Sequence, residues 1–154
     1  MVFIIALLFE APTFAEEPQT TPQLQGGPHI GFSPYTGIIG AEIQKGHYGV
    51  TLGFPTCIGF KYYPDERGYR WFFGLHATHY NLDEHETVDN IPYNELTNTS
   101  AGAGFGYKWR WWDHLDLTLS LSALYEKERK TGSDGSRTDN SLFALPGLTI
   151  GYTF

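Results

Sequence analysis

Alternation of apolar and polar residues at a period of two predicts that this chain is all-β and forms a single up-and-down antiparallel transmembrane β-barrel of eight strands. The clearest segment is Leu115–Tyr125, where leucines alternate with Asp, Thr and Ser and only Leu124 breaks the pattern. This segment is long for a globular strand and has the length that a tilted strand needs to cross a bilayer. No long amphipathic helix is predicted, and many strands joined by turns favour a sandwich or barrel.

Four short alternating segments make up the first half of the predicted barrel. Lys45-Gly46 is a two-residue hairpin signal, and Pro55-Thr56 separates the third segment from the fourth. Because these segments are shorter than a bilayer crossing, pairwise merging into six strands in all is an alternative. Six strands would make an unusually narrow barrel with Pro55 in mid-strand, so we keep eight. The four segments are 29–34, 37–44, 47–54 and 57–63.

Four longer segments make up the second half. The polar connections around them alternate in length, with short turns at 64–68 and 110–113 and long charged loops at 81–95 and 127–139. Short turns on one side of the membrane and longer loops on the other are typical of outer-membrane barrels. The predicted strands are 69–80, 98–110, 114–127 and 140–154.

Composition of the two strand faces indicates that the apolar face meets lipid. The polar face is mainly Gly, Ser and Thr, which suits a narrow barrel interior better than a water-exposed surface. Aromatic residues gather near the strand ends, where amphipathic rings form girdles at the bilayer interfaces. The predicted interface aromatics are Trp71, Trp109, Trp111, Trp112, Tyr152 and Phe154.

The N-terminal region predicts export. The apolar run Val2–Phe9 and the small-x-small site Thr13-Phe14-Ala15 resemble a signal peptide, although no Lys or Arg precedes Lys45. A buried core strand is the alternative interpretation of this run. We therefore expect a signal peptide over 1–15, a flexible periplasmic leader over 16–28 and a barrel over 29–154.

Charge and cysteine content exclude several classes of function. The formal net charge of −7 makes nucleic acid an unsuitable partner. The single cysteine, Cys57, rules out an internal disulfide, so other interactions must hold the fold. We interpret Cys57 as a small residue at a strand end, with a reactive thiol as the alternative.

Charged residues on the polar face predict an ion-pair network inside the barrel. They lie near one end of the barrel, and charges in a confined interior must pair because unpaired burial is costly. An eight-stranded barrel holds side chains but no wide channel, so this network predicts a structural plug, with a narrow or gated pore as the alternative. The predicted network is Glu42, Lys61, Arg70, Lys108, Arg110 and Asp116.

The last strand carries a family resemblance. Its sequence, Leu148-Thr149-Ile150-Gly151-Tyr152-Thr153-Phe154, alternates and ends on an aromatic residue, and it resembles the C-terminal signal of outer-membrane barrels. With the exported N-terminus, the chain resembles eight-stranded barrels of the OmpA/OmpX-like type. That resemblance implies a monomer in the bacterial outer membrane, in contact with the bilayer and lipopolysaccharide and assembled by the outer-membrane machinery. It implies a structural, surface-interaction or narrow-pore role without a cofactor.

Two other functions remain open from the sequence. A lipid A deacylase-like barrel would need a Ser–His pair with an acid near the outer rim, where His79 lies. The serine candidates are Ser100, Ser122 and Ser141, none of them in a G-x-S-x-G motif, so we assign no catalytic residue. A soluble lipocalin-like carrier of a small apolar ligand would instead turn the aromatic face inward.

A metal site is a weak alternative for the acidic loop. His76 and His79 point to opposite faces of a strand and cannot chelate one ion together. His79, Asp83 and His85 are the weak candidate ligands, and we expect a solvated acidic loop without a metal.

Overall fold

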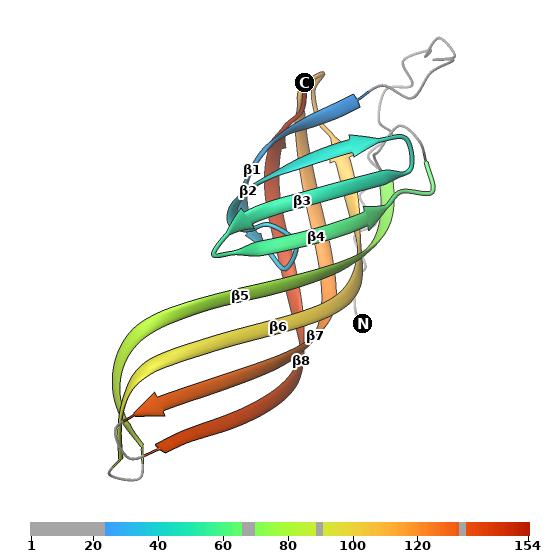
Figure 1. Ribbon diagram of the computed structural model, residues 1–154. Coiled ribbons are helices and arrows are strands. Elements are labelled where there is room, and N and C mark those ends of the chain that lie inside the picture. The colour runs from blue at the N-terminus through green and yellow to red at the C-terminus, as the bar shows by residue number, and fades with distance from the viewer. Residues whose placement is uncertain (1–23, 66–69, 89–90, 133–134) are drawn as a thin grey trace, which may run out of the picture.

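The computed structural model describes residues 24–65, 70–88, 91–132 and 135–154, with the side chains of 84–94 excepted. It confirms the prediction of an all-β, eight-stranded antiparallel barrel, because eight antiparallel strands form one closed barrel in sequence order (Figure 1). The strands are β1 (Leu24–Ser33), β2 (Gly37–Lys45), β3 (Tyr48–Phe54), β4 (Cys57–Tyr62), β5 (Arg70–Val88), β6 (Ile91–Arg110), β7 (Leu115–Gly132) and β8 (Gly135–Tyr152).

Closure of the barrel depends on a short ladder between its first and last strands. His29, Ile30, Gly31 and Phe32 of β1 pair with the β8 segment 148–151. Closure leaves no free sheet edge in this part of the molecule. No helix among the described residues is long and apolar enough to cross a membrane.

Strand lengths differ strongly between the two halves of the chain. β3 and β4 have 7 and 6 residues, whereas β5 and β6 have 19 and 20. β4 pairs with β5 only as far as Thr78, and β1 pairs with β8 only as far as Leu148. Beyond these points β5–β8 continue alone as a curved sheet (Figure 1). We call residues 79–88, 91–99, 127–132 and 135–140 the extension.

The extension corrects the predicted long loops at 81–95 and 127–139. Both regions are mainly strand, because β5 pairs with β6 up to Val88–Ile91 and β7 pairs with β8 up to Gly132–Gly135. Strand alternation shows in a sequence only where one face is buried. In the extension the sequence is mostly polar at both parities, so it shows no apolar period and the ladder hydrogen bonds alone define the strands.

The start of the barrel also differs from the prediction. β1 begins at Leu24, inside the segment 16–28 that was predicted to be a flexible leader. Gly26 and Gly27 pair with Ile43 and Glu42 of β2, so this Gly-rich stretch is part of the sheet. The predicted signal peptide, 1–15, lies outside the described residues.

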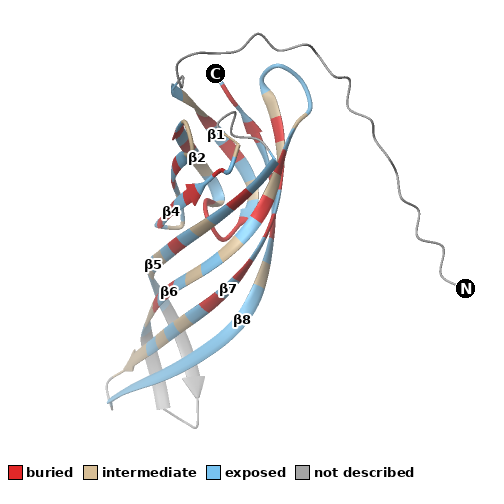
Figure 2. Ribbon diagram, turned by 90° about the vertical axis from the view of Figure 1, so that its right-hand side faces the viewer, coloured by how far each residue is buried: buried red, intermediate tan, exposed pale blue. Residues whose placement is uncertain are grey.

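Apolar side chains point outward and small polar ones inward, as the alternating burial along the strands in Figure 2 shows. Leu75, Leu119 and Ile150 are 61, 52 and 54% exposed, although they lie in the middle of the closed barrel. Phe72 and Leu124, which are apolar on the polar face of their strands, are instead buried inside. The apolar surface of this barrel is therefore its outer surface.

Two names describe the ends of the barrel. The terminus end carries Leu24, Phe154 and the β2–β3 and β6–β7 turns. The hairpin end carries the β1–β2 and β3–β4 turns and, beyond them, the extension.

Candidate functional site in the barrel interior

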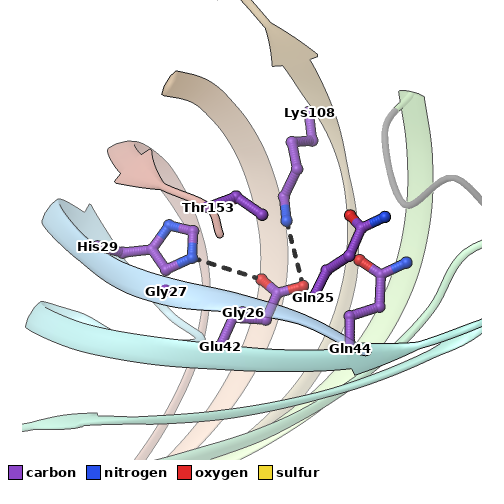
Figure 3. Close-up of a pocket in the computed structure, with 8 residues that line it drawn as sticks. All are labelled: Gln25, Gly26, Gly27, His29, Glu42, Gln44, Lys108 and Thr153. Atoms are coloured by element: carbon purple, nitrogen blue, oxygen red, sulfur yellow. Dashed lines mark hydrogen bonds and ion pairs between the residues drawn. The ribbon is translucent and has the colours of Figure 1, made fainter. Parts of the chain in front are cut away.

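A buried carboxylate on β2 is the centre of the interior at the terminus end (Figure 3). Glu42 accepts hydrogen bonds from the ammonium groups of Lys61 on β4 at 2.7 Å and Lys108 on β6 at 3.2 Å. The hydroxyl of Tyr63 donates to the same carboxylate. All four residues are buried, which makes these charge-assisted bonds stronger than surface ion pairs.

A second carboxylate balances the charge of the cluster. Asp116 on β7 accepts a hydrogen bond from the Thr153 hydroxyl at 2.6 Å. The imidazole of His29 lies between the two carboxylates, with Nε2 3.9 Å from Glu42 and Nδ1 3.7 Å from Asp116. Two carboxylates and two ammonium groups have no net formal charge, which is the condition for burying them at tolerable cost. We call these residues, with Tyr63, the Glu42 cluster.

The predicted network agrees with this geometry in part. Glu42, Lys61, Lys108 and Asp116 are all buried in the interior, and the half-buried Arg110 is the register partner of Asp116. Arg70 does not join them.

Arg70 is therefore a correction. Its side chain is 61% exposed and lies 3.9 Å from Asp65. Its φ of 82° at the start of β5 takes it out of the strand conformation, so the inward parity of the strand does not extend to this residue.

Two members of the cluster were missed by the sequence analysis. His29 stands on the parity opposite to Ile30, which was the available signal for an inward position. Tyr63 is an aromatic residue just after a strand, a position typical of an interface ring, yet it is fully buried. Residue type does not tell an interface tyrosine from an interior one.

A small hollow with room for about one water molecule lies beside the cluster at the terminus end (Figure 3). It is partly open to solvent and is too small for a ligand larger than water. Its lining residues are Gln25, Gly26, Gly27, His29, Glu42, Gln44, Lys108 and Thr153.

The β1–β2 turn folds into the barrel and fills the interior from the hairpin end. Tyr35 and Thr36 are 0 and 3% exposed. The backbone of this turn is fixed to the wall, because Thr51 donates to the Tyr35 carbonyl at 2.8 Å and the Cys57 thiol donates to the Pro34 carbonyl at 3.2 Å. We call residues 34–36 the plug.

Aromatic packing joins the plug to the Glu42 cluster. The Tyr35 ring meets Phe72 edge-to-face at 5.5 Å and His76 at 5.1 Å, and Phe72 in turn contacts Tyr63 at 5.6 Å. The Lys61 ammonium lies 4.7 Å from the centre of the Phe72 ring, a cation–π distance. Charged, aromatic and hydroxyl-bearing layers thus follow one another through the closed barrel.

Glycines on the inner wall provide the room for these rings. A Cβ atom at Gly74 would meet the Tyr35 ring, and one at Gly106 would meet the Phe72 ring. The run of alternate glycines on β6 is therefore explained by close approach of interior side chains.

A Ser–His pair occurs in the interior, but its setting offers no catalytic arrangement. His76 Nε2 is 3.0 Å from the Ser122 hydroxyl. Both residues are buried, and His76 Nδ1 has no hydrogen-bond partner within the described part of the chain, so no acid orients the ring. His79, the candidate of the enzyme hypothesis, instead contacts the Thr99 hydroxyl at 2.9 Å on the outer face.

Of the weak metal candidates, the structure describes the side chains of His79 and Asp83. Among the described residues no group of three or more His, Cys, Asp or Glu could hold a metal ion. Asp83 pairs in register with Glu95 across β5 and β6, and the side chain of His85 lies outside the described structure.

The predicted interface aromatics are all exposed and lie toward the terminus end. Trp71 and Trp109 flank Tyr107 at 5.2 and 4.5 Å, and Trp111 stacks on Trp112 at 5.8 Å. Tyr152 stacks on His114, and Phe154 is 75% exposed. These rings form an exposed aromatic group around this end of the barrel.

Comparisons with known proteins add no family assignment. No protein-family model matches the chain, and no curated protein matches it significantly.

Proposed function

We propose that the protein is an integral barrel of the bacterial outer membrane, with a closed interior and a structural and surface-interaction role. The observation that carries this proposal is the outward apolar surface. Large aliphatic and aromatic side chains cover the outside of all eight strands, which a soluble protein does not tolerate over so wide an area.

The height of the apolar band supports a bilayer as its surroundings. On β7 the outward residues are apolar from Leu117, the partner of Trp109, to Tyr125. Ten residues separate Leu117 from Lys127, the first outward charge, which is about 33 Å along a strand and about 25 Å along the normal at the usual barrel tilt. This matches the apolar band of outer-membrane barrels, with the aromatic group at one margin.

The carrier alternative lacks support from the interior. A lipocalin-like protein encloses an apolar cavity for its ligand. Here the inner wall is formed by Gly, Ser, Thr and paired charges, and the plug and Phe72 occupy the middle of the barrel. The pore alternative requires ions to pass both the Glu42 cluster and the plug, which occupy the barrel interior one behind the other.

A charge on the outer surface tests the membrane proposal. Leu121 is the middle outward residue of the β7 band, and we expect Leu121→Arg to lower the free energy of unfolding in phospholipid vesicles by about 2–4 kcal/mol. Ser136→Arg, on the outer face of β8 but well beyond the band, is the control and should change it by less than about 1 kcal/mol. Urea titration followed by tryptophan fluorescence measures both. Equal tolerance of both variants would refute a lipid-facing band.

The extension supports the surface-interaction part of the proposal. β5 pairs with β4 only as far as Thr78 and β8 pairs with β1 only from Leu148 onward, so in the extension each of these two strands pairs with a described strand along one edge only. Free edges of this kind accept an added strand from another chain. The extension would stand outside the membrane, where a partner can reach it.

Shortening the hairpins tests whether the extension serves contact or folding. We replace 81–97 by Asn-Gly between the partners Tyr80 and Asn98, and 128–139 by Asn-Gly between Lys127 and Asn140. Since the Glu42 cluster and the plug lie within the closed barrel, the shortened protein should still fold and keep its heat-modifiable gel mobility. Failure to fold would make the extension part of the folding unit.

A further inference from the structure

The outer face of the extension changes character at a single row of the sheet. The last apolar row runs across β5–β8 as the register partners Ala77, Ala101, Tyr125 and Leu142. The next two outward rows are wholly polar and combine cations with hydroxyl, amide and imidazole groups. They are His79, Thr99, Lys127 and Asn140, followed by Asn81, Thr97, Arg129 and Thr138.

The two cations of these rows have no acidic partner among the residues that the structure describes. Lys127 and Arg129 are exposed, and neither forms an ion pair with any residue that the structure describes. On the opposite face of β7 and β8, Lys130 lies 3.4 Å from Glu128 and Arg137 lies 3.0 Å from Asp139. The cations of the inner face thus form ion pairs within the protein, whereas the two cations of the outer face are available to a ligand.

The position of these cations suits an anionic headgroup. Lys127 follows the apolar band directly, at about 25 Å from the aromatic group along the membrane normal. Lipid phosphate groups lie at this depth, just beyond the acyl chains. Asp83 and Glu95 face each other one row farther out, so the acidic part of this face stands farther from the acyl chains than the cations do.

We propose that Lys127 and Arg129, with the neighbouring Thr97, Thr99 and Asn140, bind the phosphate of a phosphorylated lipid of the outer leaflet. Resting on the proposed function, this names a partner: a phosphoglycolipid of the lipopolysaccharide type. The ammonium and guanidinium groups bind the phosphate oxygens, the hydroxyl and amide groups donate further hydrogen bonds, and Tyr125 and Leu142 contact the acyl chains. No covalent step is involved.

Lipid retention by matched variants tests the proposal. The folded protein, K127Q/R129Q and the control K130Q/R137Q are each titrated in maltoside micelles with lipid A that carries both phosphates, and bound lipid is measured by native mass spectrometry. Both variants lose two positive charges, K127Q/R129Q from the outer face of β7 and K130Q/R137Q from the inner faces of β7 and β8. We expect K127Q/R129Q to bind about tenfold more weakly and the control to bind within about twofold of the unmodified protein.

Two ligand controls identify the source of the phosphate. Lipid A freed of phosphate should bind the unmodified protein as weakly as intact lipid A binds K127Q/R129Q, and millimolar inorganic phosphate should not displace intact lipid A. Equal losses in both variants, or unchanged binding of the dephosphorylated lipid, would overturn the proposal. Insertion of the unmodified protein into vesicles is scored separately, because failure to insert contradicts the membrane proposal, whereas insertion with equal lipid binding contradicts only this inference.

Discussion

Glu42→Gln should lower the free energy of unfolding by about 3–5 kcal/mol, which is the usual cost of removing one partner from a buried ion pair. The substitution keeps the size of the side chain but removes the charge that Lys61 and Lys108 share at 2.7 and 3.2 Å. Two ammonium groups would then face each other in the interior with only Asp116 to balance them. Urea unfolding in micelles, followed by tryptophan fluorescence and by the gel mobility of unheated samples, measures the loss.

A more exposed pair on the same molecule serves as the control. Glu128 contacts Lys130 at 3.4 Å with side chains that are 31 and 18% exposed. Because water screens such a pair, Glu128→Gln should cost less than about 1 kcal/mol. The double variant E42Q/K61M should recover part of the loss, since it removes one of the stranded charges. A loss of the same size in E128Q and E42Q would show that the cluster contributes no more than a surface pair.

The alternation of strand residues predicts which side of the barrel wall a side chain faces more reliably than the polarity of the individual residue does. Phe72 and Leu124 looked like exceptions because they are apolar on a polar face, yet both obey the backbone alternation and point inward. Glu42 and Lys61 were placed inside by the same rule. A pleated strand fixes the side on which a residue lies whatever its type, so parity finds interior residues wherever the strand is regular.

The predictions were wrong or incomplete where the regular strand ends and where the two faces of a strand do not differ in polarity. Arg70 has the inward parity, but its positive φ turns the chain at the first residue of β5. Residues 81–88 and 128–132 are strand, but their sequences are mostly polar at both parities, so no apolar period marks them. Tyr35 is in a turn, and nothing in a turn sequence tells whether it folds over the barrel rim or away from it. These features depend on pairing and packing between distant segments.

Tyr35→Ala is the second substitution for which we expect a large effect, a loss of about 3–5 kcal/mol in the free energy of unfolding. The Tyr35 ring is fully buried between Phe72 and His76, and its removal leaves those rings without their contact. The carbonyl of residue 35 still accepts the Thr51 hydroxyl, so the turn keeps its backbone attachment and the loss comes mainly from packing. The same urea titration measures it.

Tyr35→Phe separates the ring from its hydroxyl. The Tyr35 hydroxyl is 3.5 Å from both the Gly74 carbonyl and the Ser122 hydroxyl, the limit of a hydrogen bond. We therefore expect Y35F to cost less than about 1 kcal/mol. If Y35F destabilised the protein as much as Y35A, the hydroxyl and not the ring would hold the plug.

Ion conduction by Y35A tells which layer closes the barrel. Planar bilayers containing the unmodified protein should show no channel currents, because the plug and the Glu42 cluster lie one behind the other. Y35A should also stay silent, since Tyr63 and Phe72 still pack together and the two lysines remain bonded to Glu42. Opening then requires the combined Y35A/E42Q variant. Currents from Y35A alone would make the plug the only barrier and would favour a gated pore over a closed structural barrel.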